Sequence, residues 1–489
     1  MNRDGFGKGK WVFIDWMGID PGYGTAWSGD PTLPGEAQPT GVELKVHPPR
    51  VIPGWVIAPD RPCDEKGISP YASVLEDGGR FHCWYECHGR QDDPGINVSV
   101  AYAVSEDGVH WTKPELDARE VDGSGANNLT DLRSHGACVF VDPVASPAER
   151  FKTAGLHTVQ PDAPDTHHAR PQCTAKWWRQ VGGAVSADGV RWQALAEPIL
   201  RRQFCDTQTV VDYDPGLAQY VLYTRQRDGL MKRRGISRSA SADFRTFPPS
   251  QPVVGASPLD PPDWDYQSHG YHRWPGGTGA HLMLQTIFYR GEDRMGIHLA
   301  TSRDGIQWHR PQGRQAWLAV DDISETTDYA GAHSCHGILP TAPGEWSVYV
   351  RPYHHGHNEN KQFRTPAGLM RAVLREDGFV SLHSRGRGEF WTVPFVLDVD
   401  RIGLNVKAGF AGCLRVGIER VLGDYDNMAS CRAEPITGYG LGDCREIGHD
   451  RPNADVSWSG GGLAALRGQT VRLHVQMYQA DLFAIRFGA

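Results

Sequence analysis

The sequence lacks the features of several large classes of protein. It contains no apolar run long enough to span a membrane, and its first residues, MNRDGFGKGKW, lack the apolar core of a signal peptide. It has no long basic run and its net charge is −8, which argues against nucleic acid and anionic membrane surfaces as partners. We therefore expect a cytoplasmic protein, and the sequence leaves its oligomeric state open.

Cysteine is present but not grouped. Of the ten cysteines, Cys83 and Cys87 stand four apart, and no second close pair completes a zinc pattern. We expect buried free thiols in a reducing compartment, and a few disulfides remain the alternative for an exported chain. No pattern in the sequence requires a cofactor.

Turn residues and tryptophan are plentiful by contrast. The 489 residues include 57 Gly, 34 Pro and 16 Trp, and 39% are hydrophobic while 22% are charged. This composition is typical of a globular chain with many short strands and turns.

A seven-residue pattern, S-x-D-G-x-x-W, recurs along the chain. It reads SEDGVHW at 105–111, SADGVRW at 186–192 and SRDGIQW at 302–308, with a weaker copy, SADFRTF, at 241–247. Asp-Gly favours a tight hairpin turn with positive φ at both positions, and the preceding residues are apolar or alternate as in a strand. Each copy therefore predicts a β-hairpin in a repeated structural unit.

Two groups of side chains in these copies are expected to be structural. The tryptophans return on the next strand, where they should be largely buried in equivalent hairpins: Trp111, Trp192 and Trp308. The aspartates should cap their own turns: Asp107, Asp188 and Asp304.

The spacing of the copies predicts a ring of blades. Each interval accommodates four short strands and a long loop, and such units bury an apolar face only against their neighbours. We predict an all-β chain, with a five-bladed β-propeller at 66–386 followed by a small β-sandwich at 387–489. Residues 1–65 are expected to form an N-terminal wrapping segment.

These features together resemble the five-bladed propeller glycoside hydrolases, families 32 and 43 among them. The chain is similar to a bacterial, family-32-like branch also in D-T-Q at 206–208, D-G-F-V-S-L at 377–382 and V-S-W at 456–458. The segment WMGIDPGYG at 16–24 resembles the nucleophile motif W-M-N-D-P-N-G, but it has an extra residue and lacks both asparagines. The resemblance implies a glycoside hydrolase on a propeller and leaves the catalytic residues to be assigned.

Acids precede several of the expected first strands, at the axial mouth where propeller chemistry is expected. Glycoside hydrolysis needs two carboxylates facing each other across the scissile bond. We predict Asp64, Asp206 and Asp265 as the catalytic carboxylates, and Asp206 is the strongest because no turn glycine stands beside it. Acids before strands are also ordinary turn formers, so each residue has a structural alternative. The next acids to test are Asp131, Glu325 and Asp328.

Polar and aromatic side chains near the same openings are predicted to bind the substrate. They are Tyr71, Gln208, Gln267, His269, His333, His336 and Arg351. Blade packing is the competing interpretation for the aromatic residue. The odd spacing of His333 and His336 places them on opposite faces of a strand, so we assign no metal site. An axial metal ion with one histidine ligand stays an open alternative.

We therefore predict a glycosidase that acts on a carbohydrate substrate. It would be exo-acting on a terminal glycosidic bond, with furanosides among the candidate substrates, because a closed funnel admits a chain end more easily than a chain middle. Two alternatives share the fold: a non-catalytic carbohydrate-binding propeller and a phosphate-dependent glycoside phosphorylase. The phosphorylase would need basic residues for phosphate, and Arg201-Arg202 or 232–234 are the candidate runs.

Overall fold

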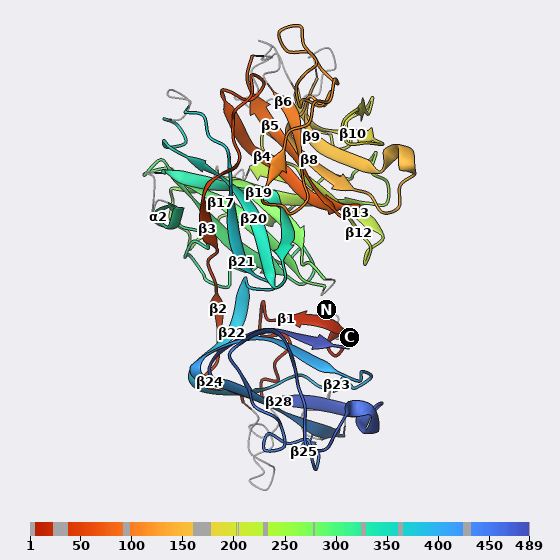
Figure 1. The fold of residues 1–489 in the computed structure, drawn as a ribbon, viewed down its shortest axis with the longest axis vertical. Helices are drawn as coiled ribbons and strands as arrows, with labels where there is room; N and C mark the ends of the chain where they lie inside the picture. The colour runs from red at the N-terminus through yellow and green to blue at the C-terminus, as the bar shows by residue number, and fades with distance from the viewer. Residues whose placement is uncertain are drawn as a thin grey trace. The chain divides into compact units, whose positions relative to one another are not determined.

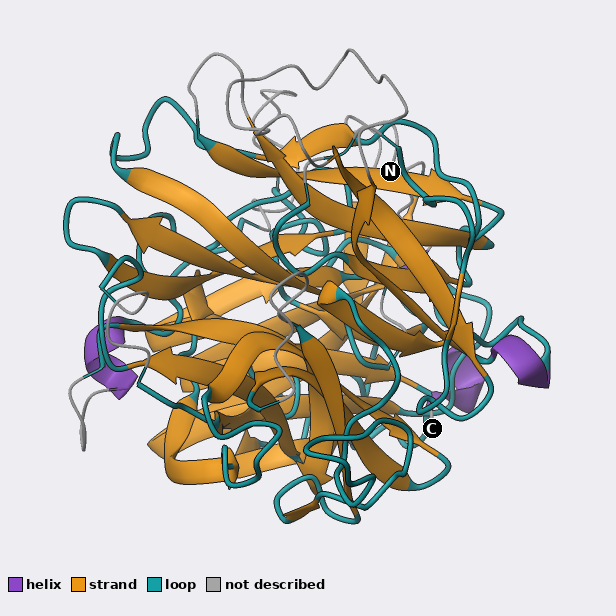
Figure 2. Cartoon of the chain, turned by 90° about the horizontal axis from the view of Figure 1, so that it is seen from above, coloured by secondary structure: helices purple, strands orange, loops and turns teal. Residues whose placement is uncertain are grey.

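The computed structural model describes most of the chain, and it is nearly all β. The described residues are 5–22, 38–90, 98–159, 178–201, 203, 205–227, 233–276, 279–323, 329–359, 365–423 and 432–488. Figure 2 shows that strands and loops make up most of this part, and helix is confined to short pieces such as α2 (Val320–Ile323). No helix in these ranges is long and apolar enough to cross a membrane.

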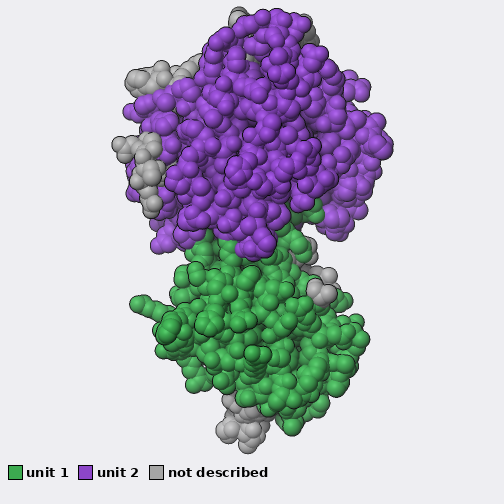
Figure 3. Space-filling model, in the orientation of Figure 1, with its two compact units in different colours: residues 1–47, 273–280, 375–489 green, residues 48–272, 281–374 purple. Residues whose placement is uncertain are grey.

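The chain divides into two compact units (Figure 3). The propeller unit comprises residues 48–272 and 281–374, and the C-terminal unit comprises residues 1–47, 273–280 and 375–489. Each unit has a buried apolar core of its own.

The strands of the propeller unit form five antiparallel groups in chain order, which confirms the predicted five blades, and Figure 1 labels many of these strands. Two groups are separate sheets, and the other three are linked by parallel bridges into one larger sheet. Blade one is β4 (Gly67–Asp77), β5 (Arg80–His88), β6 (Ser99–Ser105) and β7 (Trp111–Thr112). Blade two is β8 (His135–Val141), β9 (Phe151–Val159), β10 (Trp178–Ser186) and β11 (Gln193–Ala194). Blade three is β12 (Val210–Asp214), β13 (Gln219–Arg227), β14 (Arg234–Ser241) and β15 (Gln251–Val254). Blade four is β16 (Trp264–Arg273), β17 (His281–Tyr289) and β18 (Arg294–Ser302).

Blade five takes its outer strand from the N-terminal side of the chain. Its strands are β19 (Gly331–Ala342), β20 (Glu345–Tyr353), β21 (Leu369–Arg375) and β3 (Arg50–Ile57), and β3 pairs antiparallel with β21. The first strand of the propeller unit thus completes its last blade, so that segments from the two ends of the unit pair in one sheet.

Hydrogen bonds between blades join the inner strands around the ring. Gln208 donates from Nε2 to the carbonyls of Ala72 and Ala137, at 3.1 Å each, and so joins blades one, two and three. The Thr207 hydroxyl donates to the Gln267 carbonyl in blade four (3.3 Å). Blade five joins blade one through a bridge between His336 and Ser73. The beginnings of these strands are therefore held in fixed relative positions.

The three full copies of S-x-D-G-x-x-W form equivalent turns. In each, Asp Oδ1 accepts two backbone N–H groups that follow it, at 2.8 Å, and Ser Oγ accepts the Gly N–H at 2.9 Å. The aspartates therefore cap their own turns, as predicted. Only the glycine adopts positive φ, between 68° and 74° in Gly108, Gly189 and Gly305.

The glycine carbonyl of each copy also accepts a hydrogen bond from the preceding blade. Tyr349 donates to Gly108 (2.5 Å), Trp84 to Gly189 (2.6 Å) and Tyr223 to Gly305 (2.6 Å). Each donor lies on the second strand of its blade. The repeated pattern therefore does more than turn the chain, because it joins one blade to the next.

The tryptophans of the pattern are mostly covered and pack against the apolar cores of the blades, in agreement with the expected structural role. Each indole Nε1 donates to the glycine carbonyl of its own turn, at 3.2, 3.0 and 3.1 Å for Trp111, Trp192 and Trp308. Each ring therefore fixes its own turn against the blade.

The C-terminal unit is built on long, bent strands. Its main sheet has the order β2 (Glu43–Val46), β22 (Val380–Trp391), β28 (Thr470–Phe487), β24 (Ile402–Leu422) and β25 (Arg432–Pro435). Around it pair β1 (Gly9–Val12), β23 (Phe395–Val396), β26 (Ile447–Gly448) and β27 (Asp450–Asp455). Register shifts interrupt β22 and β24 where they pair with β28, and such bulges bend a strand. This is how a few long strands supply both faces of the β-sandwich.

The expected domain limits agree only in part with the strand pairing in the structure. The limit between 386 and 387 falls inside β22, whose first residues already pair with β2 in the C-terminal unit. Residues expected to form one N-terminal wrapping segment pair partly in the C-terminal unit, through β1 and β2, and partly in blade five, through β3. The division into 1–65, 66–386 and 387–489 stays a prediction from sequence.

Candidate active site

Polar and ionisable side chains gather where the inner strands begin. They come from all five blades, and we call them the axial cluster: Tyr71, Glu86, His135, Asp206, Arg225, Arg234, Asp265, Gln267, His333, Arg351 and Tyr353. Most of these residues are buried, which is unusual for charged groups unless they are paired or bind a ligand.

Asp206 precedes β12 and faces a buried arginine. The Arg225 guanidinium, on β13, donates to Asp206 Oδ1 and to the Asp206 carbonyl, and it also donates to the Gln267 carbonyl of blade four. The Asp206 side chain keeps 27% of its surface exposed, whereas Arg225 keeps 2%. Arg225 thus fixes the position of the Asp206 carboxylate, while part of the Asp206 side chain faces solvent.

Asp265 lies at the start of β16 and is more enclosed. Its side chain is 4% exposed, and its Oδ2 lies 3.0 Å from both Arg234 and Arg290. The Arg234 backbone N–H donates to Oδ1 (2.6 Å), and the Arg234 guanidinium also donates to Gln267 Oε1. Asp265 and Asp206 therefore belong to one network, joined through Gln267.

Glu86 is an acid that the sequence analysis did not assign. It lies on β5, its side chain is 2% exposed, and its carboxylate lies 3.1 Å from His135 Nδ1. The Gly136 N–H donates to Glu86 Oε2 at 2.9 Å. Burial alone would raise the pKa of Glu86, but His135, His88 and the Gly136 N–H outweigh it and lower the pKa. Glu86 is therefore a carboxylate anion that orients the His135 ring, whose side chain is 29% exposed.

Tyr71 lies between these groups. Its ring packs edge-on against His135 with centroids 5.1 Å apart, and the Thr207 hydroxyl hydrogen-bonds to it. Burial raises the pKa of Tyr71, which Arg225 opposes and Glu86 reinforces. A neutral phenol in this position can donate a hydrogen bond to a ligand.

Blade five contributes His333, Arg351 and Tyr353. His333 and Arg351 are cross-strand partners on β19 and β20, and Arg351 lies 4.0 Å from the centroid of the Tyr353 ring. Arg351 Nε donates to the Ile68 carbonyl of blade one (3.0 Å). Burial, with Arg351 and Arg225 nearby, lowers the pKa of His333 well below its usual range, so its imidazole is neutral at pH 7.

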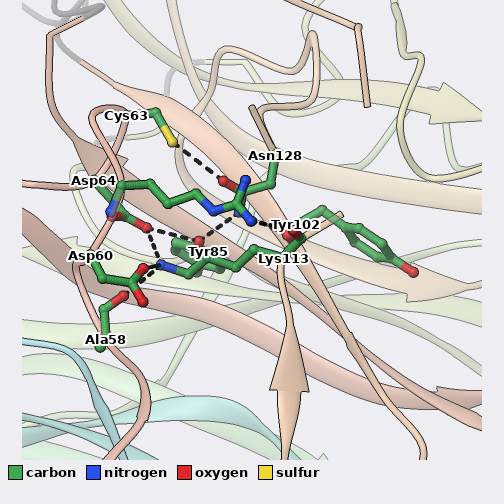
Figure 4. A network of polar contacts seen from close by, with 9 residues as sticks. Ala58, Asp60, Cys63, Asp64, Tyr85, Tyr102, Lys113 and Asn128 are labelled. Atoms are coloured by element: carbon green, nitrogen blue, oxygen red, sulfur yellow. Dashed lines mark hydrogen bonds and ion pairs between the residues drawn. The ribbon is translucent and has the colours of Figure 1, made fainter. Parts of the chain in front are cut away.

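Asp64 is fully buried and lies in a separate network (Figure 4). Its Oδ2 lies 2.6 Å from Lys113 Nζ and accepts the Tyr85 hydroxyl at 3.0 Å, while Oδ1 accepts the Arg61 N–H at 2.8 Å. Its side chain has no exposed surface, and none of these partners belongs to the axial cluster. The predicted convergence of all three aspartates therefore does not hold for Asp64, because Lys113 draws it into the packing of blade one.

The remaining predicted substrate contacts are structural in this arrangement. Gln208 uses its amide to join three blades, as described above. His269 Nε2 lies 3.1 Å from the Tyr223 carbonyl, and burial lowers the pKa of His269 to about 4. His336 stacks on His272 with centroids 4.5 Å apart. Asp131, a further candidate acid, accepts the Trp192 N–H at 2.7 Å. Glu325 and Asp328 lie outside the described residues.

Comparison with known proteins finds similarity only among solved structures. No protein-family model and no curated protein sequence matches the chain. The Bombyx mori GH32 β-fructofuranosidase is similar at 10% identity, with 91% of this chain and 95% of that chain covered and a TM-score of 0.42. The Bacillus subtilis family 43 arabinoxylan arabinofuranohydrolase is similar at 12% identity, with 89% and 99% covered and a TM-score of 0.39. The Coprinopsis cinerea GH62 α-L-arabinofuranosidase catalytic domain is similar at 12% identity, with 67% and 97% covered and a TM-score of 0.45.

Metal and disulfide chemistry find little support in the described part of the chain. Within it, no group of three or more His, Cys, Asp and Glu side chains is placed to hold a metal ion. The eight cysteines it includes are all free, and all but Cys413 are buried. The axial metal ion stays an untested alternative.

The residues that sequence reasoning missed share one property. Glu86 and His135 acquire their roles from each other, 49 residues apart, and Arg234, named before only within the candidate phosphate run 232–234, acquires its role from Asp265 and Gln267. Glu86 did carry one signal, since it is an acid inside the otherwise apolar or aromatic strand segment Cys83–Cys87. A buried acid in a strand needs a partner, and this would have marked it as a candidate.

Proposed function

We propose that this protein is a glycoside hydrolase whose reaction takes place at the axial cluster. The observation that carries the proposal is Asp206, since it is held by a buried arginine and still keeps about a quarter of its side-chain surface exposed. Glu86 and Asp265 are 2% and 4% exposed, so Asp206 is the carboxylate of the cluster best able to reach a substrate.

Asp206 is assigned the role of nucleophile or of the base that activates water. Arg225 contacts both its carboxylate and its carbonyl, which fixes the direction of the side chain. A fixed carboxylate at bonding distance from the anomeric carbon is the central requirement of glycoside hydrolysis.

His135 is assigned the role of proton donor to the leaving oxygen. Glu86 contacts Nδ1 and orients the ring, which keeps 29% of its surface exposed, and an anionic partner favours the charged imidazolium. Glu86 is then a positioning residue. This assignment replaces one member of the expected carboxylate pair with a carboxylate-oriented histidine.

The substrate is proposed to be a terminal sugar. Tyr71 and Gln267 lie beside Asp206 and offer groups that bind hydroxyls, and a site on a closed ring is reached from one end. Exo-action and a preference for furanosides are parts of this proposal that follow from the expected funnel and from the resemblance. The alternative of a binding-only propeller predicts sugar binding without turnover.

A substrate screen with one pair of variants tests the proposal. The parent protein is expected to release aryl alcohol from at least one aryl glycoside or furanoside, and Asp206→Asn should lower kcat at least about a hundredfold. Asp188→Asn is the control, since Asp188 caps a turn away from the cluster, and it should keep the parent kcat. Near-parent turnover by Asp206→Asn, or sugar binding with no turnover of any substrate, would contradict the proposal.

A further inference from the structure

Among the residues that the structure describes, one buried cation of the axial cluster has no acid beside it. Arg225 contacts Asp206, while Arg234 and Arg290 contact Asp265. Arg351 is 6% exposed and contacts the Ile68 carbonyl and the Tyr353 ring, and among the described residues no carboxylate forms an ion pair with it.

The imidazole next to Arg351 is also without polar partners. His333 is 1% exposed, and neither Nδ1 nor Nε2 forms a hydrogen bond within the described part of the chain. Arg351 Nη1 lacks a partner in the same sense. Three buried polar atoms without partners therefore lie on neighbouring positions of β19 and β20, paired in register at His333 and Arg351.

Such an arrangement is costly unless something binds there. A buried guanidinium without a counter-ion loses its hydration, and a carbonyl and a ring face offset only part of this cost. Every other arginine named in the cluster offsets this cost with an acid, and Arg351 does not. Groups left unsatisfied in a folded protein are typical of ligand sites.

We propose that Arg351 and His333 form a subsite for an oxyanion. Arg351 supplies the positive charge and planar N–H donors that match a carboxylate or a phosphate, and neutral His333 supplies one further N–H donor. This inference rests on the proposed function for its substrate class: the oxyanion is either the carboxylate of a sugar acid at the scissile end or a phosphate that replaces water as the acceptor.

Binding measurements on the full chain test the subsite without requiring turnover. Calorimetric titration with glucuronate and galacturonate is compared with glucose and galactose, and with inorganic phosphate. We expect saturable binding of one oxyanion class, and Arg351→Gln should weaken it at least tenfold. Arg351→Lys keeps the positive charge and should retain part of the affinity for the oxyanion. The matched control is Arg371→Gln, which removes an arginine of the same blade that pairs with Glu345.

The outcomes distinguish a sugar acid from phosphate as the ligand, and they test the oxyanion subsite separately from the proposed hydrolase function. Saturation by uronates assigns a sugar-acid substrate, and saturation by phosphate assigns phosphorolysis. Equal affinity of the parent and Arg351→Gln, or no binding of any oxyanion by the parent, overturns the subsite. If Arg351→Gln does not fold, His333→Phe removes the second donor and must weaken binding. Hydrolysis of neutral glycosides without oxyanion binding leaves the proposed function standing, and oxyanion binding without hydrolysis leaves the subsite standing.

Discussion

Aspartates with similar sequence contexts occupy different environments in this protein. Asp64, Asp206 and Asp265 all precede or begin an inner strand, but their side chains are 0%, 27% and 4% exposed. The nearest cation decides the difference. Lys113 encloses Asp64 within blade one, whereas Asp206 keeps part of its side chain exposed beside Arg225.

Asp64→Asn is expected to lower stability and to leave catalysis intact. The change leaves Lys113, 8% exposed, with only the exposed Asp60 as an acidic partner. The loss should be about 3 kcal/mol, the low end for breaking a buried pair, because Asp60 remains. Urea unfolding measures it, with kcat of the folded variant as the second readout. A hundredfold loss of kcat at unchanged stability would return Asp64 to the catalytic group.

Buried histidines make the fold sensitive to mild acid. Burial lowers the pKa of His269 and of His298 to about 4, from 6.5 in an unfolded chain. At pH 7 both states are neutral, so the two groups cost no stability there. Below pH 6.5 the two histidines become protonated in the unfolded chain but stay neutral in the folded state. The free energy of unfolding therefore falls until about pH 4.

The expected loss between pH 7 and pH 5 is on the order of 2 kcal/mol per histidine. His298 Nε2 hydrogen-bonds to the Tyr289 hydroxyl at 2.7 Å, and His298→Gln keeps a polar group there. This variant should remove the part of the pH-dependent loss of stability that is due to His298. His110→Gln is the control, because His110 is 87% exposed. Urea unfolding at the two pH values measures both, and an unchanged pH dependence in His298→Gln would contradict this account.

At the scale of elements, the repeated turn joins neighbouring blades through its glycine. Its local geometry comes from Ser and Asp side chains that cap nearby N–H groups, so each copy can form independently of the ring. Its carbonyl then accepts a donor from the preceding blade. The weaker copy lacks the glycine, and there Lys152 of blade two lies 5.2 Å from the Phe244 ring centroid.

Gly189→Ala should therefore cost more than the strain of its backbone alone. A Cβ at this position would lie 2.5 Å from Trp84 Cζ2, and φ is 74°. Gly78→Ala is the matched control, because φ is 62° and nothing lies within 4 Å of its Cβ. We expect about 1–2 kcal/mol for Gly78→Ala and about 2 kcal/mol more for Gly189→Ala, measured by urea unfolding. Equal losses would mean that the two blades can separate at this point without cost.

At the scale of the whole molecule, each unit has its own core and its own buried charges. Asp377 of the C-terminal unit is fully buried and contacts Lys10 (2.7 Å) and Arg486 (3.1 Å). Ile57 of the propeller unit is 2% exposed and packs in the core that closes blade five onto blade one. Such separate cores favour separate unfolding transitions.

Two variants test whether the units unfold separately. Asp377→Asn suits the positive φ of this residue and removes only the charge, at a cost of about 3–5 kcal/mol. Ile57→Ala should cost about 2–5 kcal/mol. In scanning calorimetry each variant is expected to lower the midpoint temperature of a different unfolding transition. A single transition whose midpoint both variants lower would show that the two cores unfold together.

The fold was predictable from sequence because its signals are local. Asp-Gly turns, capping serines and alternating strands act over a few residues, and three copies of one pattern are enough to indicate a ring of blades. Asp206 could be chosen as a candidate for a similar reason, since an acid in Asp-Thr-Gln has no turn glycine beside it.

The sequence by itself determined an all-β chain and the number of blades, and it singled out Asp206 as a candidate acid. Only the tertiary structure decided which charges meet: Glu86 with His135, Asp265 with Arg234, and Arg351 with no carboxylate of the described residues. The physical reason is that a charge in water is nearly indifferent to its distant neighbours in sequence. Inside the ring, burial makes each charge depend on the partner that another blade brings to it.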